Sequence, residues 1–209
     1  MAPTKWGILG AGSISNDFVN AIYALDDNSS HEVSPCGIEI IKKVTNLWHF
    51  SKCSHIQVVA VAARNLVRAQ EFAKKFDIPK AYDNYEDIAK DQSLDIIYVA
   101  TICRSHLEVC KMLLDNGKNV LCEMPLALDV KETQEMLDYA KERKRFFMEG
   151  MCTWFLPVYK KLKQEIESGT IGKVCNVISD FGFKVEGINS EKLARKDTNI
   201  NEAMICWYL

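Results

Sequence analysis

The sequence lacks a strong excess of charge of either sign. Its 209 residues contain 26 lysines and arginines against 28 aspartates and glutamates, a formal net charge of -2. Proteins that bind nucleic acids or anionic membranes through their overall field usually carry a clear positive excess. No apolar run approaches the ~18 residues of a membrane-spanning helix, and the run near the N-terminus is too short for a signal-peptide core. We therefore expect no nucleic-acid partner, no membrane association and a cytoplasmic location.

The sequence also lacks the cysteine spacing of a metal or redox motif. None of its eight cysteines forms a C-x-x-C pair, the usual spacing of a zinc knuckle or a thioredoxin-like site. We interpret them as small buried hydrophobes in a reducing compartment and predict no metal centre. Hydrophobic residues make up 48% of the chain and charged residues 26%, which is typical of a globular protein and excludes a disordered tail.

Short apolar runs alternate with segments of helical periodicity through the first 150 residues. Continuous apolar runs predict buried strands, and apolar residues three or four positions apart predict helices. We expect strands at 5–9, 56–63, 95–101, 119–122 and 146–148, and helices at 14–25, 66–76, 85–90, 105–116 and 129–145. This alternation predicts an α/β fold with a doubly wound parallel sheet, the Rossmann architecture, over residues 1–150.

Two segments depart from this alternation. Residues 26–54 place 29 positions where α/β units usually connect in about 2–6, so they are either a surface excursion or an insertion that the fold does not need. After residue 150, a helix over 157–168, a turn over 169–172 and a strand over 173–183 predict the start of a C-terminal α/β domain with an open sheet. We expect this second domain, residues 151–209, to be incomplete.

The turn after the first predicted strand matches the dinucleotide fingerprint G-x-G-x-x-G, except that Ser15 holds its third position. Gly10 permits a tight turn, and Gly12 lets the backbone approach a pyrophosphate at the start of the next helix, where the helix dipole favours an anion. Ser13 and Ile14 begin that helix and complete the candidate site. Two glycines are also compatible with an ordinary turn, but their place between a strand and a helix favours the nucleotide site.

Two arginines follow the second predicted strand, where such folds contact the adenosine ribose. Arg64 lies 52 residues beyond Gly12, and 23 when the 29-residue segment is set aside, close to the usual spacing of about 20. An acid at this place suits NAD, whereas arginine suits the 2′-phosphate of NADP. Arg64 and Arg68 are about one helical turn apart and can reach one phosphate, which favours NADP. The alternative is that both are ordinary solvated charges.

Several stretches together resemble the Gfo/Idh/MocA family of nicotinamide-dependent oxidoreductases, in particular its dimeric dihydrodiol dehydrogenase branch, whose members also oxidise D-xylose. They cover most of residues 5–182 outside 26–54 and read WGI at 6–8, ISNDF at 14–18, VVAVAAR at 58–64, DIPKAY at 77–82, VLCE at 120–123 with Pro125, and FG at 181–182. The resemblance implies one domain that holds NADP and a second that covers a diol or sugar substrate and forms a homodimer. A second domain this short argues against the dimer here.

The same resemblance assigns roles to residues after the fourth and fifth predicted strands. It places Thr101 and His106 in the loop after the fourth strand, on the nicotinamide side, where ligands of parallel sheets bind. A histidine at a helix start is equally often a capping or surface residue. Glu123 opens a motif that reads Glu-Lys-Pro in the family, but here Met124 precedes Pro125. A thioether cannot act as an acid, a base or an oxyanion stabiliser.

The other residues that the family uses on its substrate are altered as well. Its second catalytic pair, an aspartate four residues before a tyrosine or histidine, has only Tyr208 as a remnant, because Met204 stands four positions earlier. Trp154, Phe155 and Phe181 are candidates for an apolar substrate pocket, although core packing explains such aromatics equally well. No catalytic group of the family is therefore intact in this sequence.

The residues support two hypotheses. The first is an NADP-dependent dehydrogenase of dihydrodiols or sugars, in which a hydride passes between the hydroxyl-bearing carbon of the substrate and the nicotinamide. The second is a catalytically impaired or inactive NADP-binding homologue or fragment. Met124, residues 26–54 and the missing second cluster favour the second hypothesis.

Overall fold

The computed structural model describes residues 3–27 and 56–178. Contacts within the chain divide it into two compact units, Met1–Leu156 and Pro157–Leu209. The elements described in the first unit are β1 (Thr4–Leu9), α1 (Ser13–Asp27), β2 (Ile56–Ala62), α3 (Leu66–Lys75), β3 (Lys80–Tyr82), α4 (Tyr85–Lys90), β4 (Ile96–Val99), the 3-10 turn η2 (Cys103–Ser105), α5 (His106–Asp115), β5 (Asn119–Cys122), α6 (Val130–Glu142), β6 (Phe147–Glu149) and the 3-10 turn η3 (Cys152–Phe155). Helix α7 (Pro157–Glu167) opens the second unit.

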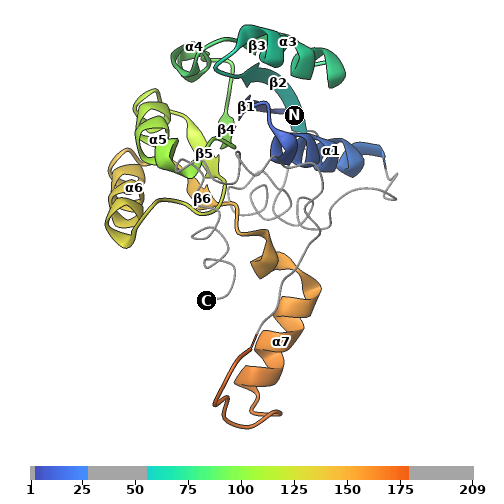
Figure 1. Cartoon of the computed structure of the whole chain (residues 1–209), viewed down its shortest axis with the longest axis vertical. Coiled ribbons are helices and arrows are strands. Elements are labelled where there is room, and N and C mark those ends of the chain that lie inside the picture. Colours follow the sequence, from blue (N-terminus) through green and yellow to red (C-terminus); the bar gives the residue numbers. More distant parts are fainter. Residues whose placement is uncertain (1–2, 28–55, 179–209) are drawn as a thin grey trace, which may run out of the picture. The chain divides into compact units, whose positions relative to one another are not determined.

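Six parallel strands of the first unit form one sheet in the order β3-β2-β1-β4-β5-β6 (Figure 1). The strand order reverses beside β1, and ligands of open α/β sheets bind where it reverses, at the carboxyl ends of the strands. Leu9 pairs with both Ala62 and Val99, so the chain leaves β1, β2 and β4 at the same edge. The predicted doubly wound Rossmann architecture is confirmed.

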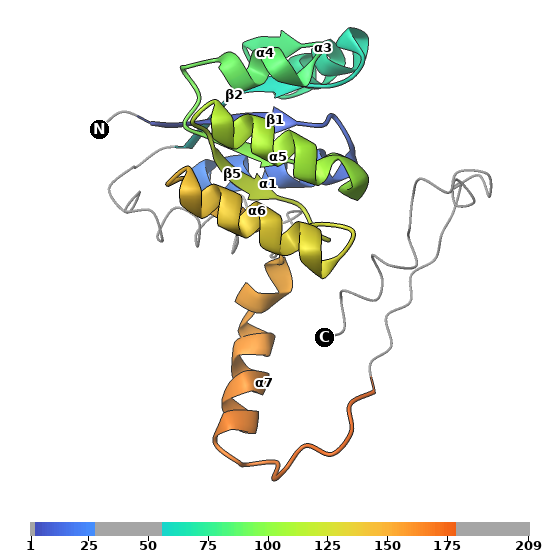
Figure 2. The ribbon, with the colours of Figure 1, turned by 90° about the vertical axis from the view of Figure 1, so that its left-hand side faces the viewer.

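Side chains alternate along the strands between two hydrophobic cores. Trp6 and Ile8 of β1 belong to the core under α1 and α3, whereas Leu9 belongs to the core under α4, α5 and α6. Figure 2 shows α5 and α6 side by side over this second core. All four residues of β4, Ile96–Val99, are buried. Because both faces of the central strands are covered, these strands appear in the sequence as continuous apolar runs.

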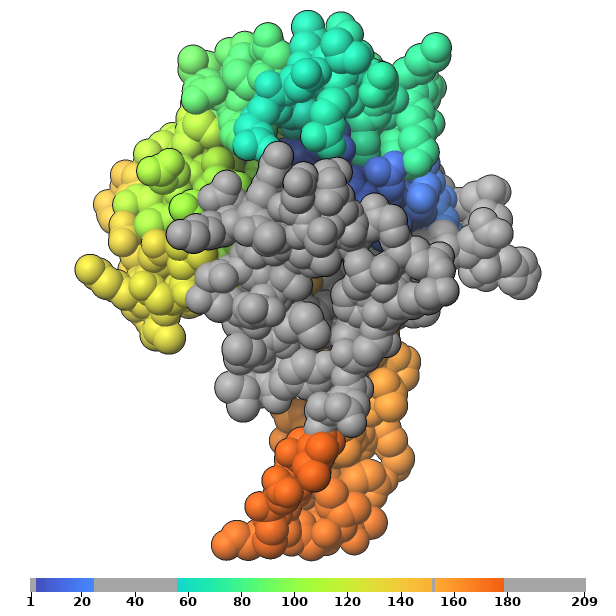
Figure 3. Space-filling model, in the orientation of Figure 1, coloured from blue at the N-terminus to red at the C-terminus, as the bar shows by residue number. Residues whose placement is uncertain are grey.

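Helices α1 and α3 are neighbours on the first of these cores, as the adjoining blue and teal surfaces of Figure 3 show. The Tyr23 hydroxyl donates to the carbonyl of Phe76 at 2.6 Å, and Lys75 Nζ donates to Asn16 Oδ1 at 2.6 Å. Helix α1 follows the glycine turn directly. Arg64 lies just before α3, and Arg68 lies in its first turn. These contacts therefore hold the two parts of the candidate nucleotide site in one arrangement.

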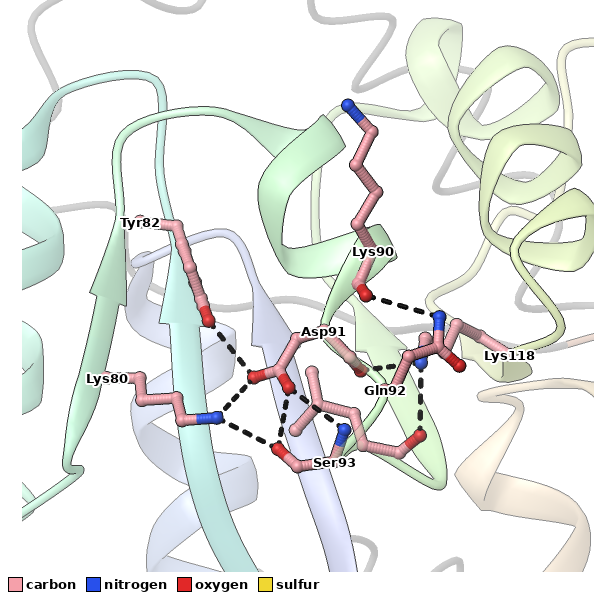
Figure 4. A network of polar contacts seen from close by, with 8 residues as sticks. Lys80, Tyr82, Lys90, Asp91, Gln92, Ser93 and Lys118 are labelled. Atoms are coloured by element: carbon pink, nitrogen blue, oxygen red, sulfur yellow. Dashed lines mark hydrogen bonds and ion pairs between the residues drawn. The ribbon is translucent and has the colours of Figure 1, made fainter.

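A polar network ties the amino-terminal edge of the sheet together (Figure 4). Asp91 Oδ2 accepts from Lys80 Nζ at 2.7 Å and from the Tyr82 hydroxyl at 3.0 Å. The buried Lys118, just before β5, donates to the Asp91 carbonyl at 2.6 Å. Burial alone raises the pKa of Asp91, but hydrogen bonds to its carboxylate, from Lys80 first, outweigh burial and hold this pKa well below its usual range. The network joins β3, β5 and the loop after α4 at the edge opposite the glycine turn.

The structure corrects three details of the predicted elements. Strand β3 was not expected, because its three residues are only half-buried and produce no apolar run. Helix α1 continues to Asp27, so the first two residues of the segment 26–54 are helical, and the rest of that segment lies outside the described residues.

The strand predicted at 173–183 is wrong over 173–178, which form no regular element; 179–183 lie outside the described residues. An alternating pattern makes a strand only where a neighbouring strand takes up its backbone hydrogen bonds. No such neighbour of 173–178 exists among the residues that the structure describes.

Candidate nucleotide-binding site

Gly10 occupies a backbone conformation that only glycine adopts readily. Its φ is +111°, and its N–H donates to the Ala62 carbonyl at 2.8 Å, which binds the turn to the end of β2. A Cβ at this position would lie 2.5 Å from the Ala100 carbonyl oxygen. The tight turn that the fingerprint requires is therefore formed, and it packs directly against the chain leaving β4.

Ser15, the mismatch in the fingerprint, is fully buried and closes this turn. Its hydroxyl donates to the Gly10 carbonyl at 2.5 Å. The usual glycine or alanine allows close helix–strand packing at this position. Serine is small enough for the same packing and adds a bond between α1 and the turn. The substitution therefore keeps the shape of the fingerprint.

Gly12 faces open space at the start of α1. A Cβ there would meet no atom within 4 Å, and the Gly12 carbonyl accepts from the backbone and side-chain nitrogens of Asn16 at 3.2 and 2.8 Å. The first N–H groups of a helix have no partners within it, and with the helix dipole they favour an anion. Ser13 and Ile14 supply the first of these groups, and Ile14 is exposed. The residues present thus fit the pyrophosphate of a dinucleotide.

Arg64 and Arg68 are exposed just beyond β2, and Arg68 reaches back to the glycine turn. Asn65 caps α3 by accepting from the Arg68 N–H at 3.2 Å, and Arg68 Nη2 donates to the Ala11 carbonyl at 3.2 Å. The fold therefore brings Arg68, which is 57 positions from Ala11 in the sequence, to the turn. Asn65 also leaves this position without the carboxylate that typically binds the ribose of NAD.

Thr101 and His106 lie together in the segment that follows β4. The Thr101 hydroxyl accepts from the Ser105 hydroxyl at 2.9 Å. His106 is buried: its Nε2 is 3.1 Å from the Thr101 carbonyl, and its Nδ1 is 3.1 and 3.2 Å from the carbonyls of Pro125 and Leu126. The imidazole therefore links the loops after β4 and β5. Burial lowers its pKa, although the facing carbonyls act in the opposite direction.

Glu123 lies directly after β5 and faces the interior. Its carboxylate accepts from the buried Tyr98 hydroxyl and, at 3.2 Å, from the Met124 N–H. The Tyr98 ring stacks on Phe18 of α1 with 3.8 Å between ring centroids. Burial raises the pKa of Glu123 above its ordinary value of 4.5 despite these hydrogen bonds, and nearby Glu149 adds to the rise. Glu123 thus connects the β5 loop to β4 and, through Tyr98, to α1.

Glu149, at the end of β6, holds the same loop from the other side. Its Oε1 accepts from the Leu126 N–H at 3.0 Å, and burial raises its pKa. The peptide bond between Met124 and Pro125 is cis. Glu123, Glu149 and His106 therefore fix the backbone on both sides of position 124. The described contacts of this loop do not use the Met124 side chain.

The aromatic residues proposed for a substrate pocket divide into three cases. Phe155 is half-buried and packs against the core under α1 and α3, as the core-packing alternative expects. Trp154 is 62% exposed in η3. Phe181 and Tyr208 lie outside the described residues. A pocket formed by these side chains stays a prediction.

Three residues at the carboxyl edge, Tyr85, Tyr98 and Glu149, were not predicted as site residues, and Ser15 was treated only as a mismatch. Ser15 looked like a defect in a motif, and Tyr98 was hidden in an apolar run. A polar group directly after a predicted strand was an available signal for Glu149, which follows the predicted strand 146–148, whereas Tyr98 lies inside the predicted strand 95–101. The partners of Tyr98 and Glu149 lie in the loop after β5, so spacing along the chain does not indicate them.

Within residues 3–27 and 56–178, no three histidine, cysteine, aspartate or glutamate side chains are grouped in a way that holds a metal ion. None of the helices in these ranges has the length and apolar character needed to cross a bilayer. Of the cysteines that these ranges include, Cys110 and Cys122 are buried as expected, Cys103 is half-buried, and Cys175 is exposed, which corrects the interpretation of Cys175 as a core residue.

Comparison with known proteins finds relatives over most of the chain. A protein from Xenopus tropicalis named trans-1,2-dihydrobenzene-1,2-diol dehydrogenase is 39% identical over 182 residues, which are 87% of this chain and 47% of that protein. The protein of the same name from Mus musculus is 37% identical over 184 residues, 88% of this chain and 47% of that protein. The chain spans about half the length of the curated relatives it matches.

Solved structures share the fold at lower identity. The 3-ketoreductase KijD10 from Actinomadura kijaniata, crystallised with NADP, superposes with a TM-score of 0.63 at 22% identity over 82% of this chain and 46% of that chain. Myo-inositol 2-dehydrogenase from Lactobacillus plantarum has a TM-score of 0.63 at 21% identity over 83% and 43%.

The sequence model of one family, described as an oxidoreductase family with an NAD-binding Rossmann fold, matches residues 4–151. This match spans the glycine turn, the parallel sheet and the loop that contains Met124. The chain therefore belongs to the Gfo/Idh/MocA family of oxidoreductases.

Proposed function

We propose that this chain binds NADP along the carboxyl edge of its sheet and derives from a dehydrogenase of dihydrodiols or sugars. The contact between Arg68 and the Ala11 carbonyl supports the proposal most directly, because it puts the Arg68 guanidinium beside the glycine turn. The backbone at Gly12 and the start of α1 would bind the pyrophosphate, and Arg64 with Arg68 would bind the 2′-phosphate. The names of the relatives from Xenopus tropicalis and Mus musculus support a diol as substrate.

When bound, the nicotinamide exchanges a hydride with the carbon that bears the substrate hydroxyl. The chain itself must then orient the substrate, exclude water and accept the proton of that hydroxyl. The polar atoms of His106 and Glu123 are hydrogen-bonded to neighbouring backbone and side-chain groups. We therefore propose that these two residues position the loops beside the nicotinamide and do not accept the proton. The position where the family carries lysine holds Met124, which accepts no proton.

This substitution favours a second candidate, a nucleotide-binding homologue with impaired or absent catalysis. Loss of a general acid or base typically lowers a rate by about 10²–10⁴. Nucleotide binding does not depend on that group, because the turn and the arginines lie in other loops. The two candidates therefore share NADP binding and differ in turnover.

A titration with NADPH, followed by its fluorescence, and the same titration with NADH test the binding. We expect NADP(H) to bind more tightly than NAD(H), and Arg64→Ala to weaken NADPH binding by about tenfold or more, because a charge-assisted contact to phosphate is lost. Lys74→Ala, which removes an exposed cation in the last turn of α3, is the control and should change nothing. Absence of NADPH binding, or tighter binding of NADH, would contradict the proposal.

Turnover of a trans-dihydrodiol and of D-xylose with NADP separates the two candidates. A rate typical of dehydrogenases, in a protein that binds NADP, supports the first candidate and rejects the second. Binding without turnover supports the second. In either case the binding titration is read independently of the rate.

A further inference from the structure

The carboxyl ends of β2 and β3 bring a tyrosine to the predicted arginines. Ala62 pairs with Tyr82 in the sheet, and the Ala63 N–H donates to the Tyr82 carbonyl at 3.1 Å. The chain therefore leaves the two strands side by side. Arg64 follows two residues after β2, and Tyr85 follows three residues after β3.

Tyr85 is held in place by its helix and by the core. It is the first residue of α4, which Asn84 caps by accepting from the Asp87 N–H at 2.8 Å. Its half-buried ring packs against the core under α4, α5 and α6. An anchored aromatic ring has few rotamers to lose, so its hydroxyl is presented in one direction at little entropic cost.

The Tyr85 hydroxyl lies in the field of both arginines. Burial raises the pKa of Tyr85, and the positive charges of Arg64 and Arg68 act in the opposite direction. This agrees with the strand pairing, which brings the segments that carry Arg64 and Tyr85 out of the sheet side by side. Among the described residues the Tyr85 hydroxyl has no hydrogen-bond partner. The hydroxyls of Tyr82 and Tyr98 instead donate to the carboxylates of Asp91 and Glu123.

We infer that Tyr85 is a specificity-determining residue of the adenosine end of the site, with its hydroxyl donating to a 2′-phosphate that Arg64 and Arg68 hold. A phosphate dianion between two guanidinium groups and a phenol hydroxyl satisfies all three donors. NAD carries an uncharged 2′-hydroxyl at this place, which lacks the negative charge that the two guanidinium groups would bind. The inference rests on the proposed NADP binding and adds a residue to it.

Tyr85→Phe tests the role, because phenylalanine keeps the packed ring and removes only the hydroxyl. The matched control is Tyr82→Phe, whose hydroxyl is bound to Asp91 at the other edge. Each variant is titrated with NADPH and NADH, and with the fragments adenosine 2′,5′-bisphosphate and adenosine 5′-monophosphate. Circular dichroism and thermal melting establish that both variants are folded.

We expect Tyr85→Phe to weaken NADPH and the bisphosphate by about three- to tenfold, the effect of one hydrogen bond to a charged group, and to leave NADH and the monophosphate unchanged. Tyr82→Phe should change none of the four. The phosphate-bearing ligands should also perturb the tyrosine absorbance near 295 nm in the wild type and in Tyr82→Phe but not in Tyr85→Phe.

Equal losses for NADPH and NADH would assign Tyr85 a packing role only and overturn the inference, as would full NADPH affinity in Tyr85→Phe. In both cases NADPH binding that depends on Arg64 leaves the proposed function intact. A wild type that does not bind NADPH refutes the proposed function itself.

Discussion

The two halves of the carboxyl edge are built on different principles. Around the turn after β1 and the end of β2, the backbone at Gly12 meets open space and Arg64 and Arg68 are exposed. In the loops after β4 and β5, the polar groups of His106 and Glu123 point inward and bond to neighbouring residues. The first half is arranged for a ligand, and the second is arranged to fix its own backbone.

This difference explains how binding and catalysis separate in such a fold. In the proposed site, nucleotide binding is spread over a backbone turn, a helix start and two cations, so we expect one side-chain change to remove only part of it. Proton transfer depends on a single titratable group at one position. The loop around Met124 keeps its shape because Glu123, Glu149 and His106 hold it without the side chain at 124.

The largest expected effect comes from restoring a titratable group at position 124. We expect Met124→Lys to raise turnover of a dihydrodiol or D-xylose with NADP by about 10²–10⁴, with NADPH affinity unchanged. Met124→Leu is the control and should leave turnover at the wild-type level. Steady-state kinetics beside a fluorescence titration measure both quantities. If Met124→Lys binds NADPH but gains no activity, catalysis requires further groups that this chain lacks besides the lysine.

The next prediction compares alanine substitutions at the two glycines of the turn. Gly10→Ala places a Cβ against the Ala100 carbonyl at a positive φ, and we expect a loss of about 3 kcal/mol in the free energy of unfolding. Gly12→Ala meets no atom and should unfold like the wild type, but it should bind NADPH more weakly because the methyl group enters the pyrophosphate site. Urea unfolding and the titration read the two effects separately. A Gly12→Ala variant with unchanged affinity would argue against the pyrophosphate site.

A smaller effect is expected from His106, which contacts the loops after β4 and β5. Neutral His106 carries one N–H, which donates either to the Thr101 carbonyl or to the carbonyls of Pro125 and Leu126. His106→Leu removes this hydrogen bond from a buried position and should cost about 2 kcal/mol of unfolding free energy at pH 8. Burial lowers the pKa of His106 below 6.5, so the unfolded chain binds the proton more tightly. Wild-type stability from this group is therefore present above pH 6.5 and is lost as the pH falls below it.

The difference between the wild type and His106→Leu should accordingly shrink on acidification. Urea unfolding at pH 8, 6.5 and 5 measures it. A difference that grows toward pH 5 would mean that the three carbonyls stabilise the imidazolium more than burial opposes it. His106→Asn, whose side-chain amide also carries N–H donors, should fall between the two proteins at pH 8.

Most of the fold could be predicted from the sequence because its signals are local. Helix α4 begins at Tyr85 and ends at Lys90 as predicted, and α6 begins directly after Asp129, the first residue of the helix predicted there. Helix caps and apolar runs act over a few residues, so they are visible in a short stretch of sequence. Strand β3 was not predicted because three half-buried residues produce no apolar run. The strand predicted over 173–178 is wrong because an alternating pattern does not by itself supply a neighbouring strand.

The part of the candidate site that consists of main-chain groups, the glycine turn, could be predicted from the sequence. Gly10 and Gly12 were found from their spacing, and the structure shows why position 10 requires glycine. His106 was placed near the nicotinamide by resemblance, but its link between two loops was not foreseen. That link joins residues about twenty positions apart, which no periodicity records.

The sequence by itself determined the alternation of strands and helices in the first unit apart from β3, the glycine turn and the absence of a proton-transfer group at position 124. Each of these depends on the chemistry of a residue and its near neighbours. Only the tertiary structure decided that Arg68 donates to the turn at Ala11, that Tyr98 donates to Glu123 and that the chain leaves β3 beside the end of β2. Those pairs form because parallel strands end at one edge of the sheet, where residues far apart in the chain become neighbours.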